Sequence, residues 1–315
     1  MEFASVFASL GCKVTIVEAM ERILPTMDRE ISQSLGMLLK KRGVAIHTGA
    51  MVVKIEQEDG QLVCCFTEKG KAQRIPAQQI LVAIGRRPNT QGLFAVGFGV
   101  ACERGRIVTD ESFRTSVEGI YAIGDVAERF NALTHHPGRL ALAGPAQRQA
   151  RAAAAHICGR QHSEHGFIGS SCIRVFDQNA AVSGLSEKAA KAAGIPCDSV
   201  LIFPNDKVSL MPECHYMAFK LIFEVPTGRI LGAQAIGRGE CDKRINVIAA
   251  MITMHASLED LKEPELCYAP QYSTAKDVVI QAALVALNVL SGEVRQGHVP
   301  HVRPSAARRA CVLDV

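Results

Sequence analysis

Residues 115–125, TSVEGIYAIGD, constrain the fold of this chain more than any other segment. Ile120 to Ile123 read as a buried strand, and Gly124 and Asp125 follow where that strand ends. In an open parallel sheet, ligands bind beyond the carboxyl ends of the strands, where glycine lets the backbone approach them and aspartate accepts hydrogen bonds from their hydroxyl groups. The segment therefore predicts a nucleotide site with Asp125 as acceptor. An ordinary strand followed by a solvated aspartate is the alternative.

The beginning of the chain predicts a helix that leads into a parallel strand. Residues 1–10 carry apolar side chains at helical spacing, Gly11 ends the helix, and the apolar strand 13–17 is followed by Glu18. In a dinucleotide fold, an acidic residue at the end of the second strand binds the adenosine ribose of NAD and repels the extra phosphate of NADP. Glu18 fits that position, although a glutamate that merely ends a surface strand fits the same pattern.

The next segments extend this α/β unit. A helix over 28–42 and a strand over 44–47 are followed by three short strands around Asp59-Gly60 and Lys69-Gly70, which predict an antiparallel meander. The meander strands are 52–56, 62–67 and 73–75. Strand 79–84 is then expected to return to the parallel sheet and to end in GRRPN, where Arg86 and Arg87 are either part of the site or a solvated turn.

A second candidate ligand contact precedes a long Ala-rich helix over 147–157. A helix N-terminus offers unpaired N–H groups and a partial positive charge, so it stabilises electron density on a ligand. We expect Leu142, Ala143 and Gly144 of the segment RLALAGP to give that close backbone approach. A loop that caps a buried helix is the alternative.

The pattern changes beyond residue 166, where five short strands alternate with helices over 186–193 and 242–255. Mixed antiparallel strands with flanking helices predict an α+β unit. The strands are 172–176, 180–184, 199–203, 216–223 and 230–236.

These segments together resemble the FAD-dependent pyridine nucleotide-disulfide oxidoreductases. The pattern T-x-x-x-x-I-Y-A-x-G-D is similar to their second FAD-binding segment, and IGRRPN is similar to the end of their NAD-binding domain. LAGPAxRQ, and YAPxYS at 268–273 in place of a His and Glu dyad, resemble the coenzyme A-disulfide reductases within that family.

The resemblance implies an α/β fold with partial Rossmann-like NAD- and FAD-binding domains, followed by an α+β dimerisation domain. It implies that Glu18 and Gly85 contact NAD, and that Asp125, Leu142, Ala143 and Gly144 contact FAD, with these sites at strand ends facing a common cleft. The implied units are 1–88 (NAD-binding, truncated at its start), 89–165 (the C-terminal part of the FAD-binding domain), 166–293 (interface domain) and 294–315 (a linker or the start of a rhodanese-like domain). Neither the family's glycine-rich turn nor its redox cysteine has a counterpart here, so we expect the chain to begin inside a Rossmann unit.

The same resemblance assigns a catalytic role to Tyr272, with Tyr268 as a weaker candidate. A phenol stays neutral near pH 7 and donates a hydrogen bond or a proton to a leaving thiolate, here at the reactive cysteine of a neighbouring subunit. The implied reaction is NADH-linked reduction of coenzyme A disulfide, a persulfide or a polysulfide by a homodimer. Three alternatives stay open: two tyrosines that only pack a dimer interface, an NADH oxidase or peroxidase of the same fold, and a non-catalytic dimerising remnant.

Composition excludes several other classes of function. The 315 residues suffice for two or three domains, and 35 basic against 31 acidic residues, a net charge of +4, give no argument for nucleic acid or membrane surfaces as partners. Without a long apolar run or a signal peptide, a cytoplasmic protein is expected. Eleven cysteines without a C-x-x-C pair predict buried, reduced thiols, and the surroundings of His135, His136 and His255 predict no metal site.

Overall fold

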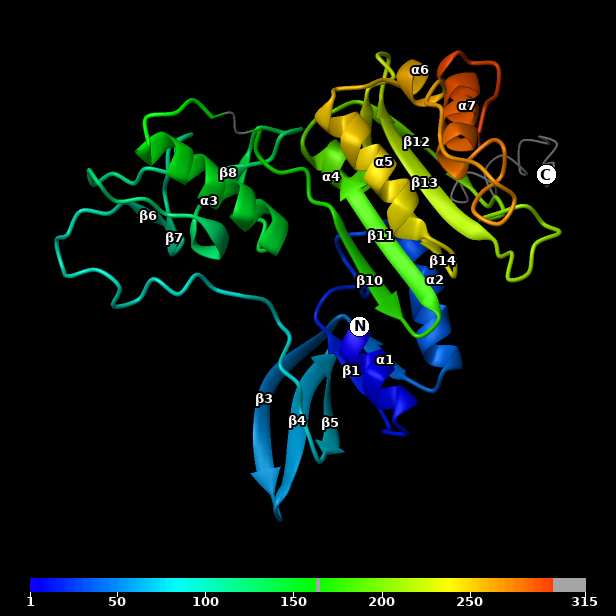
Figure 1. Cartoon of the computed structure of the whole chain (residues 1–315). Helices are drawn as coiled ribbons and strands as arrows, with labels where there is room; N and C mark the ends of the chain where they lie inside the picture. Colours follow the sequence, from blue (N-terminus) through cyan, green and yellow to red (C-terminus); the bar gives the residue numbers. More distant parts are fainter. Residues whose placement is uncertain (163–164, 297–315) are drawn as a thin grey trace.

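The computed structural model describes residues 1–162 and 165–296 and begins with the expected helix and parallel strands (Figure 1). Helix α1 (Glu2–Ser9) leads into β1 (Thr15–Glu18), and α2 (Arg29–Lys41) leads into β2 (Ala45–Thr48). β1 and β2 pair in parallel, with Thr15 opposite Ala45 and Glu18 opposite Thr48. The predicted order of helix, strand, helix and strand is confirmed.

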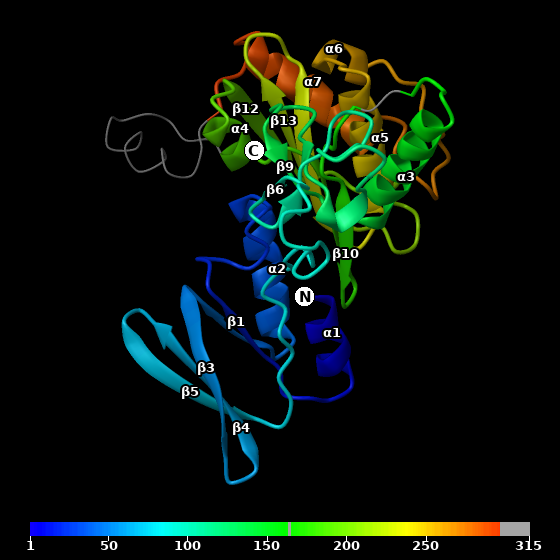
Figure 2. The same cartoon turned by 90° about the vertical axis from the view of Figure 1, so that its left-hand side faces the viewer.

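A three-stranded antiparallel sheet follows and projects away from the rest of the chain (Figure 2). It consists of β3 (Ala50–Glu58), β4 (Gln61–Glu68) and β5 (Lys71–Ala77). Both turns have left-handed backbone, with φ of 48° at Asp59 and 80° at Gly60, and 50° at Lys69 and 76° at Gly70. Two consecutive residues with positive φ match the twist of the strands that such a turn joins. The predicted meander is confirmed.

Two predicted strands, 79–84 and 120–123, do not form. Residues 78–100 instead run as an irregular link to the part of the chain that contains α3, and Ile84 is 89% exposed (Figure 1). Residues 120–123 make a single antiparallel bridge, between Tyr121 and Arg114. A strand needs a neighbour for its N–H and C=O groups, and within the described residues the parallel sheet contains only β1 and β2.

The middle of the chain consists of short elements around one helix. The predicted strand over 105–110 is reduced to β7 (Arg106–Ile107), paired with β6 (Cys102–Glu103), and β8 (Arg129–Phe130) pairs with β9 (Pro137–Gly138). The short 3₁₀ turn η1 (Gly124–Val126) packs against α3 (Ala143–Ile157). The predicted Ala-rich helix is confirmed and begins four residues earlier than expected.

A five-stranded antiparallel sheet dominates the second half, in the order β10-β11-β14-β13-β12. Its strands are β10 (Ser171–Val175), β11 (Gln178–Gly184), β12 (Cys197–Ile202), β13 (Met217–Glu224) and β14 (Ile230–Gly237). All five were expected from the sequence, and the α+β class of this part is confirmed.

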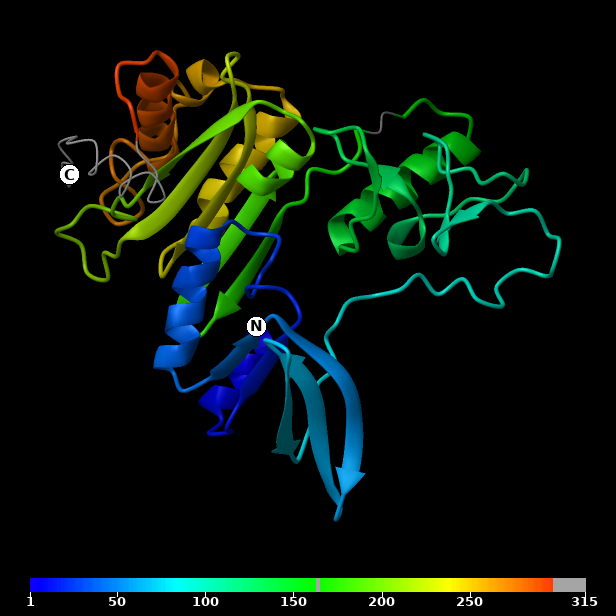
Figure 3. The same ribbon diagram turned by 180° about the vertical axis from the view of Figure 1, so that it is seen from behind.

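Helices cover both faces of this sheet (Figure 3). On one face, α5 (Cys241–Thr253), α6 (Leu258–Leu261) and α7 (Val278–Leu290) bury Phe219 and Leu221 of β13. On the other face lie α4 (Glu187–Ala192) and, from the beginning of the chain, α2, whose Ile31, Leu35 and Leu39 are fully buried. Sequence analysis did not predict α7, because an almost entirely apolar segment shows no helical periodicity.

A buried ionic cluster joins the start of α2 to β13 of the five-stranded sheet. Lys220 of β13 is 3% exposed and lies 2.8 Å from Glu187 Oε2, 3.4 Å from Asp28 Oδ2 and 3.3 Å from Glu30 Oε2. Asp28 also exchanges two hydrogen bonds with the buried Gln234 of β14, at 2.7 and 3.0 Å. The first part of the chain is therefore fixed to the second by buried charge as well as by apolar packing.

Candidate functional site

The strongest cluster of predicted site residues surrounds Asp125. Arg86 Nη1 donates to Asp125 Oδ2 at 3.2 Å, so the GRRPN turn and the AIGD segment meet although 39 residues separate them. Arg139 donates from Nη1 to the Asp125 carbonyl at 3.2 Å and from Nη2 to the Arg86 carbonyl at 2.9 Å. Both side chains of the ion pair are exposed, Arg86 at 69% and Asp125 at 50%, so the carboxylate stays accessible to a ligand.

The start of α3 lies beside this cluster. Gly124 N donates to Gln149 Oε1 of α3 at 2.6 Å, and a Cβ atom on Gly124 would stand 3.6 Å from Ala146 Cβ. Gly124 has φ of 74°, a left-handed conformation that favours glycine and aims the chain into η1. Leu142, Ala143 and Gly144 at this helix start are exposed, and no side chain in the described part of the molecule caps its N–H groups.

Glu18 lies at the predicted place, the last residue of β1, and is half-buried. Its carboxylate accepts a hydrogen bond from Met20 N at 2.9 Å, which leaves the other oxygen for a ligand. Gly85 has φ of 115° and opens the turn that carries Arg86. Across residues 1–162 and 165–296, no hydrogen bond or ion pair connects Glu18 to the Asp125 cluster, so the expected common cleft stays a prediction.

Tyr272 lies on the loop between α6 and α7, beside a polar cavity of about 420 Å³. Tyr272 is 59% exposed and Tyr268 is 50% exposed, so both phenols are accessible from solvent. The backbone behind Tyr272 is held firmly, because Ser273 and Asp277 are buried and Ser273 Oγ donates to Asp277 Oδ2 at 2.5 Å. Arg244, His215 and Asp206 line the same cavity.

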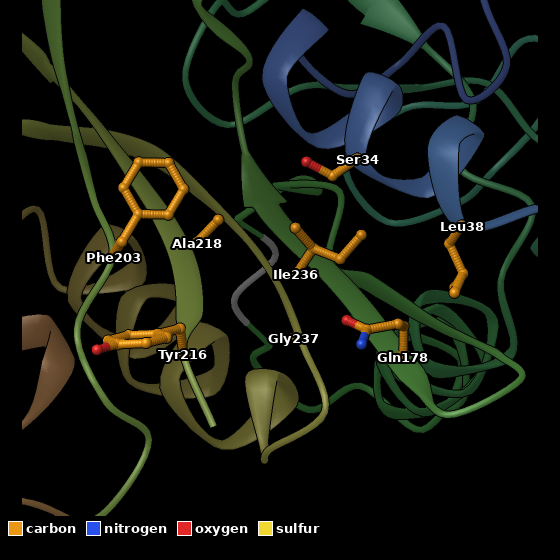
Figure 4. A pocket seen from close by; sticks show the side chains of 8 residues that line it. All are labelled: Ser34, Leu38, Gln178, Phe203, Tyr216, Ala218, Ile236 and Gly237. Atoms are coloured by element: carbon orange, nitrogen blue, oxygen red, sulfur yellow. The ribbon is translucent and has the colours of Figure 1, made fainter. Parts of the chain in front are cut away.

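A second, more apolar hollow of about 280 Å³ lies between α2 and the five-stranded sheet. Figure 4 shows the rings of Phe203 and Tyr216 on one side of it, facing Leu38 and Gln178 on the other. Phe203 is 60% exposed and Tyr216 is 73% exposed. Neither hollow is lined by Glu18 or Asp125.

The residues of the Asp125 cluster fit an edge of a flavin nucleotide. One carboxylate can accept bonds from hydroxyl groups, while the uncapped start of α3 offers N–H donors and a partial positive charge to an electron-rich group. Glu18 fits an adenosine ribose in the same way, as a free acceptor at a strand end. The chemistry of these donors and acceptors therefore agrees with both predicted nucleotides.

Comparison with known families decides the relationship. The profile described as pyridine nucleotide-disulphide oxidoreductase matches residues 1–150, and the profile of the dimerisation domain of the same family matches residues 171–279. The chain belongs to the pyridine nucleotide-disulfide oxidoreductase family. The members of this family are NAD(P)H-dependent oxidoreductases of disulfide or sulfur substrates, and they use FAD.

Three relatives illustrate the range of the family. A dihydrolipoyl dehydrogenase of Rhizobium etli is 32% identical over 91% of this chain and 58% of its own length. The NAD(P)H sulfur oxidoreductase (CoA-dependent) of Pyrococcus furiosus is 29% identical over 90% of this chain and 63% of its own. The solved structure of an NAD-dependent persulfide reductase from A. fulgidus has a TM-score of 0.88, with 33% identity over 94% of this chain and 54% of that one.

The chain thus spans 58–63% of the length of these two curated relatives. The predicted family and the predicted fold class are confirmed.

Sequence reasoning missed two arginines of these sites. Arg139 was visible inside RLALAGP, but only its contacts with Asp125 and Arg86 show that it joins two motifs. Arg244 gave no sequence signal, because a charged residue in a helix is usually solvated. The structure buries it to 1% exposure.

The cysteines differ from expectation. Of the ten described, Cys65 and Cys241 are buried, whereas five are exposed, so the expectation of mostly buried thiols is wrong. The exposed ones are Cys12, Cys102, Cys158, Cys172 and Cys267. The described residues contain no group of three or more His, Cys, Asp or Glu side chains placed to hold a metal ion. Within the same residues, no helix is long and apolar enough to span a bilayer.

Proposed function

We propose that this chain belongs to an FAD-dependent enzyme that uses NADH to reduce coenzyme A disulfide, or a related persulfide or polysulfide. The exposed phenol of Tyr272, on a loop anchored by buried polar groups, carries the proposal. It takes the place that a His and Glu dyad has in other branches of the family. The relatives named as a CoA-dependent sulfur oxidoreductase and a persulfide reductase support this choice of substrate class.

The proposed reaction converts NADH, a proton and coenzyme A disulfide into NAD⁺ and two molecules of coenzyme A. FAD, when bound, carries the electron pair between the two substrates. Asp125, Leu142, Ala143 and Gly144 are proposed to hold FAD, and Glu18 and Gly85 to hold NADH. Tyr272, with Tyr268 in a lesser role, is proposed to donate a proton or a hydrogen bond to the leaving thiolate in the partner subunit of a homodimer.

The proposed domain division follows from these roles. In this division, residues 1–88 bind NADH, residues 89–165 bind FAD, and residues 166–293 form the interface between the two subunits of the dimer. The division places the Arg86 and Asp125 ion pair at the junction of the first two units.

An assay of acceptor choice tests the proposal. NADH consumption is compared with coenzyme A disulfide, polysulfide, hydrogen peroxide and oxygen, using the full-length enzyme to which this chain belongs, supplied with FAD. We expect the disulfide or polysulfide to be preferred, and Tyr272→Phe to lower kcat about 100-fold, because a positioned general acid contributes that much. Tyr268→Phe should lower kcat by a smaller factor, in keeping with its lesser role. Preference for oxygen or peroxide, or a Tyr272→Phe variant as fast as the parent, would overturn the proposal.

A further inference from the structure

Arg244 is the largest of the fully buried side chains, with 1% of its surface exposed. It stands in the first turns of α5 and has no part in the reaction proposed above. Burying a guanidinium is unfavourable unless its N–H groups find acceptors. Its partners therefore show which parts of the fold depend on this one charge.

The guanidinium contacts hydrogen-bond acceptors on three separate segments of the chain. Nη2 donates to the Asp206 carbonyl at 2.8 Å, pairs with Asp277 Oδ2 at 3.2 Å, and donates to the Tyr272 carbonyl at 3.4 Å. Nη1 donates to the Glu240 carbonyl at 3.3 Å. Nη2 makes three of these four contacts and Nη1 makes the fourth, so both terminal nitrogens of the planar guanidinium are used.

The first of these segments is the loop between β12 and β13. Asp206 closes it, because Asp206 N donates to the His215 carbonyl at 2.9 Å and His215 N donates to Asp206 Oδ1 at 2.8 Å. Gly239 leaves room for this carboxylate, since a Cβ atom there would stand 2.3 Å from Asp206 Oδ2.

The second segment is the loop of Tyr272, which ends at Asp277, the N-cap of α7. The two loops touch directly, with Val208 N donating to the Pro270 carbonyl at 3.3 Å. His215, Gln271 and Tyr272 face the same cavity of about 420 Å³. Arg244 thus lies beneath both loops and contacts the backbone of each.

The geometry points to Arg244 as the positioning residue for Tyr272: it fixes the backbone of the Tyr272 loop against the Asp206 loop, so that the phenol projects from a rigid base. The inference rests on the proposed function for the role of the phenol. Lysine is a poor replacement here, because its side chain is one bond shorter than that of arginine and it has a single nitrogen. It therefore falls short of the Nη2 partners and cannot also keep the Nη1 contact with the Glu240 carbonyl.

Fluorine NMR of the full chain labelled with 3-fluorotyrosine tests the inference. The chain has four tyrosines, so four resonances are expected, and Tyr272→Phe identifies one of them. In Arg244→Lys we expect the Tyr272 resonance to shift or broaden while the Tyr121 resonance stays unchanged. Amide hydrogen exchange of both loops should rise about tenfold, the factor that corresponds to losing hydrogen bonds to a charged group.

Arg229→Lys is the matched control. Arg229 also pairs with a carboxylate, Glu224 Oε1 at 3.2 Å, and it lies at the β13–β14 turn. We expect this variant to leave the Tyr272 resonance in place. A Tyr272 resonance and loop exchange unchanged in Arg244→Lys would overturn the inference, as would a shift of all four resonances together.

Two further measurements distinguish a variant that does not fold, a wrong inference about Arg244, and a wrong proposal about the function of Tyr272. If Arg244→Lys does not fold, Asp277→Asn keeps an N-cap acceptor but removes the charge that pairs with Arg244, and the same local release is expected. An unchanged Tyr272 resonance in that variant also counts against the inference. Turnover of Tyr272→Phe tests the proposed function separately: normal turnover refutes the role of the phenol and leaves the NMR result for Arg244 intact.

Discussion

At the scale of single residues, Asp125 combines an ion pair with the exposure that its proposed contact with FAD requires. It is half-exposed, pairs with Arg86, and lies beside the uncapped start of α3. An exposed ion pair contributes less than about 1 kcal/mol to stability, because water screens it. This small contribution to stability agrees with the proposed role of Asp125 as a contact for FAD.

Asp125→Asn should weaken FAD binding about tenfold, since a hydrogen bond to a charged group is lost, and should change the free energy of unfolding by less than about 1 kcal/mol. Flavin fluorescence titration and urea denaturation measure the two quantities. Glu118→Gln is the control, because Glu118 is an exposed carboxylate of the same segment. Equal FAD affinity in both variants would contradict the assignment of Asp125.

At the scale of elements, Lys220 joins α2 to β13 and α4. Lys220→Met leaves the buried Asp28 without its cation and removes the buried one of the two lysines that pair with Glu187, so we expect unfolding to become easier by about 3–5 kcal/mol. Lys191→Met is the matched control: Lys191 also pairs with Glu187 but is 62% exposed, and its loss should cost less than about 1 kcal/mol. Urea denaturation of the parent protein and the two variants measures these changes. Similar midpoints for the two variants would contradict the prediction.

The same cluster predicts a pH dependence. Burial alone raises the pKa of Glu187, but hydrogen bonds from Lys191 and Lys220 outweigh it and lower the pKa to about 2 from an ordinary value of 4.5. A carboxyl group with a lowered folded-state pKa stabilises the fold above the pKa of the unfolded chain, and this stability is lost as pH falls. Urea midpoints should therefore drop between pH 4.5 and about 2, and less steeply in Glu187→Gln. Parallel profiles for the two proteins would exclude this role.

At the scale of the whole molecule, large apolar side chains stay exposed around the two loops that Arg244 joins. Leu210 is 87% exposed, and Tyr216, Tyr268 and Tyr272 are each at least half exposed. Apolar side chains gathered on one surface indicate an interface, and the dimerisation-domain match covers this part of the chain.

We expect Leu210→Asp to weaken self-association at least about tenfold, because it places a charge where the proposed dimer buries an apolar group. Val96→Asp is the control: Val96 is fully exposed on the link between β5 and the α3 region. Analytical ultracentrifugation over a range of concentrations compares the two. Equal association constants would place the dimer interface elsewhere.

The sequence alone determined most of the local elements and the family. Some features depend only on residues that are neighbours in the sequence, so they can be recognised along the chain. They include the helical spacing before Gly11, the meander around its two turns, the five later strands, and motifs such as AIGD and YAPxYS. The tertiary structure decided everything that depends on distant partners. Segments 79–84 and 120–123 have strand-like sequences but lack neighbouring strands, so they stay irregular. Lys220 and Arg244 look like surface charges in the sequence, and only the fold brings buried acceptors to them, such as Asp28, which lies 192 residues before Lys220 (220 − 28).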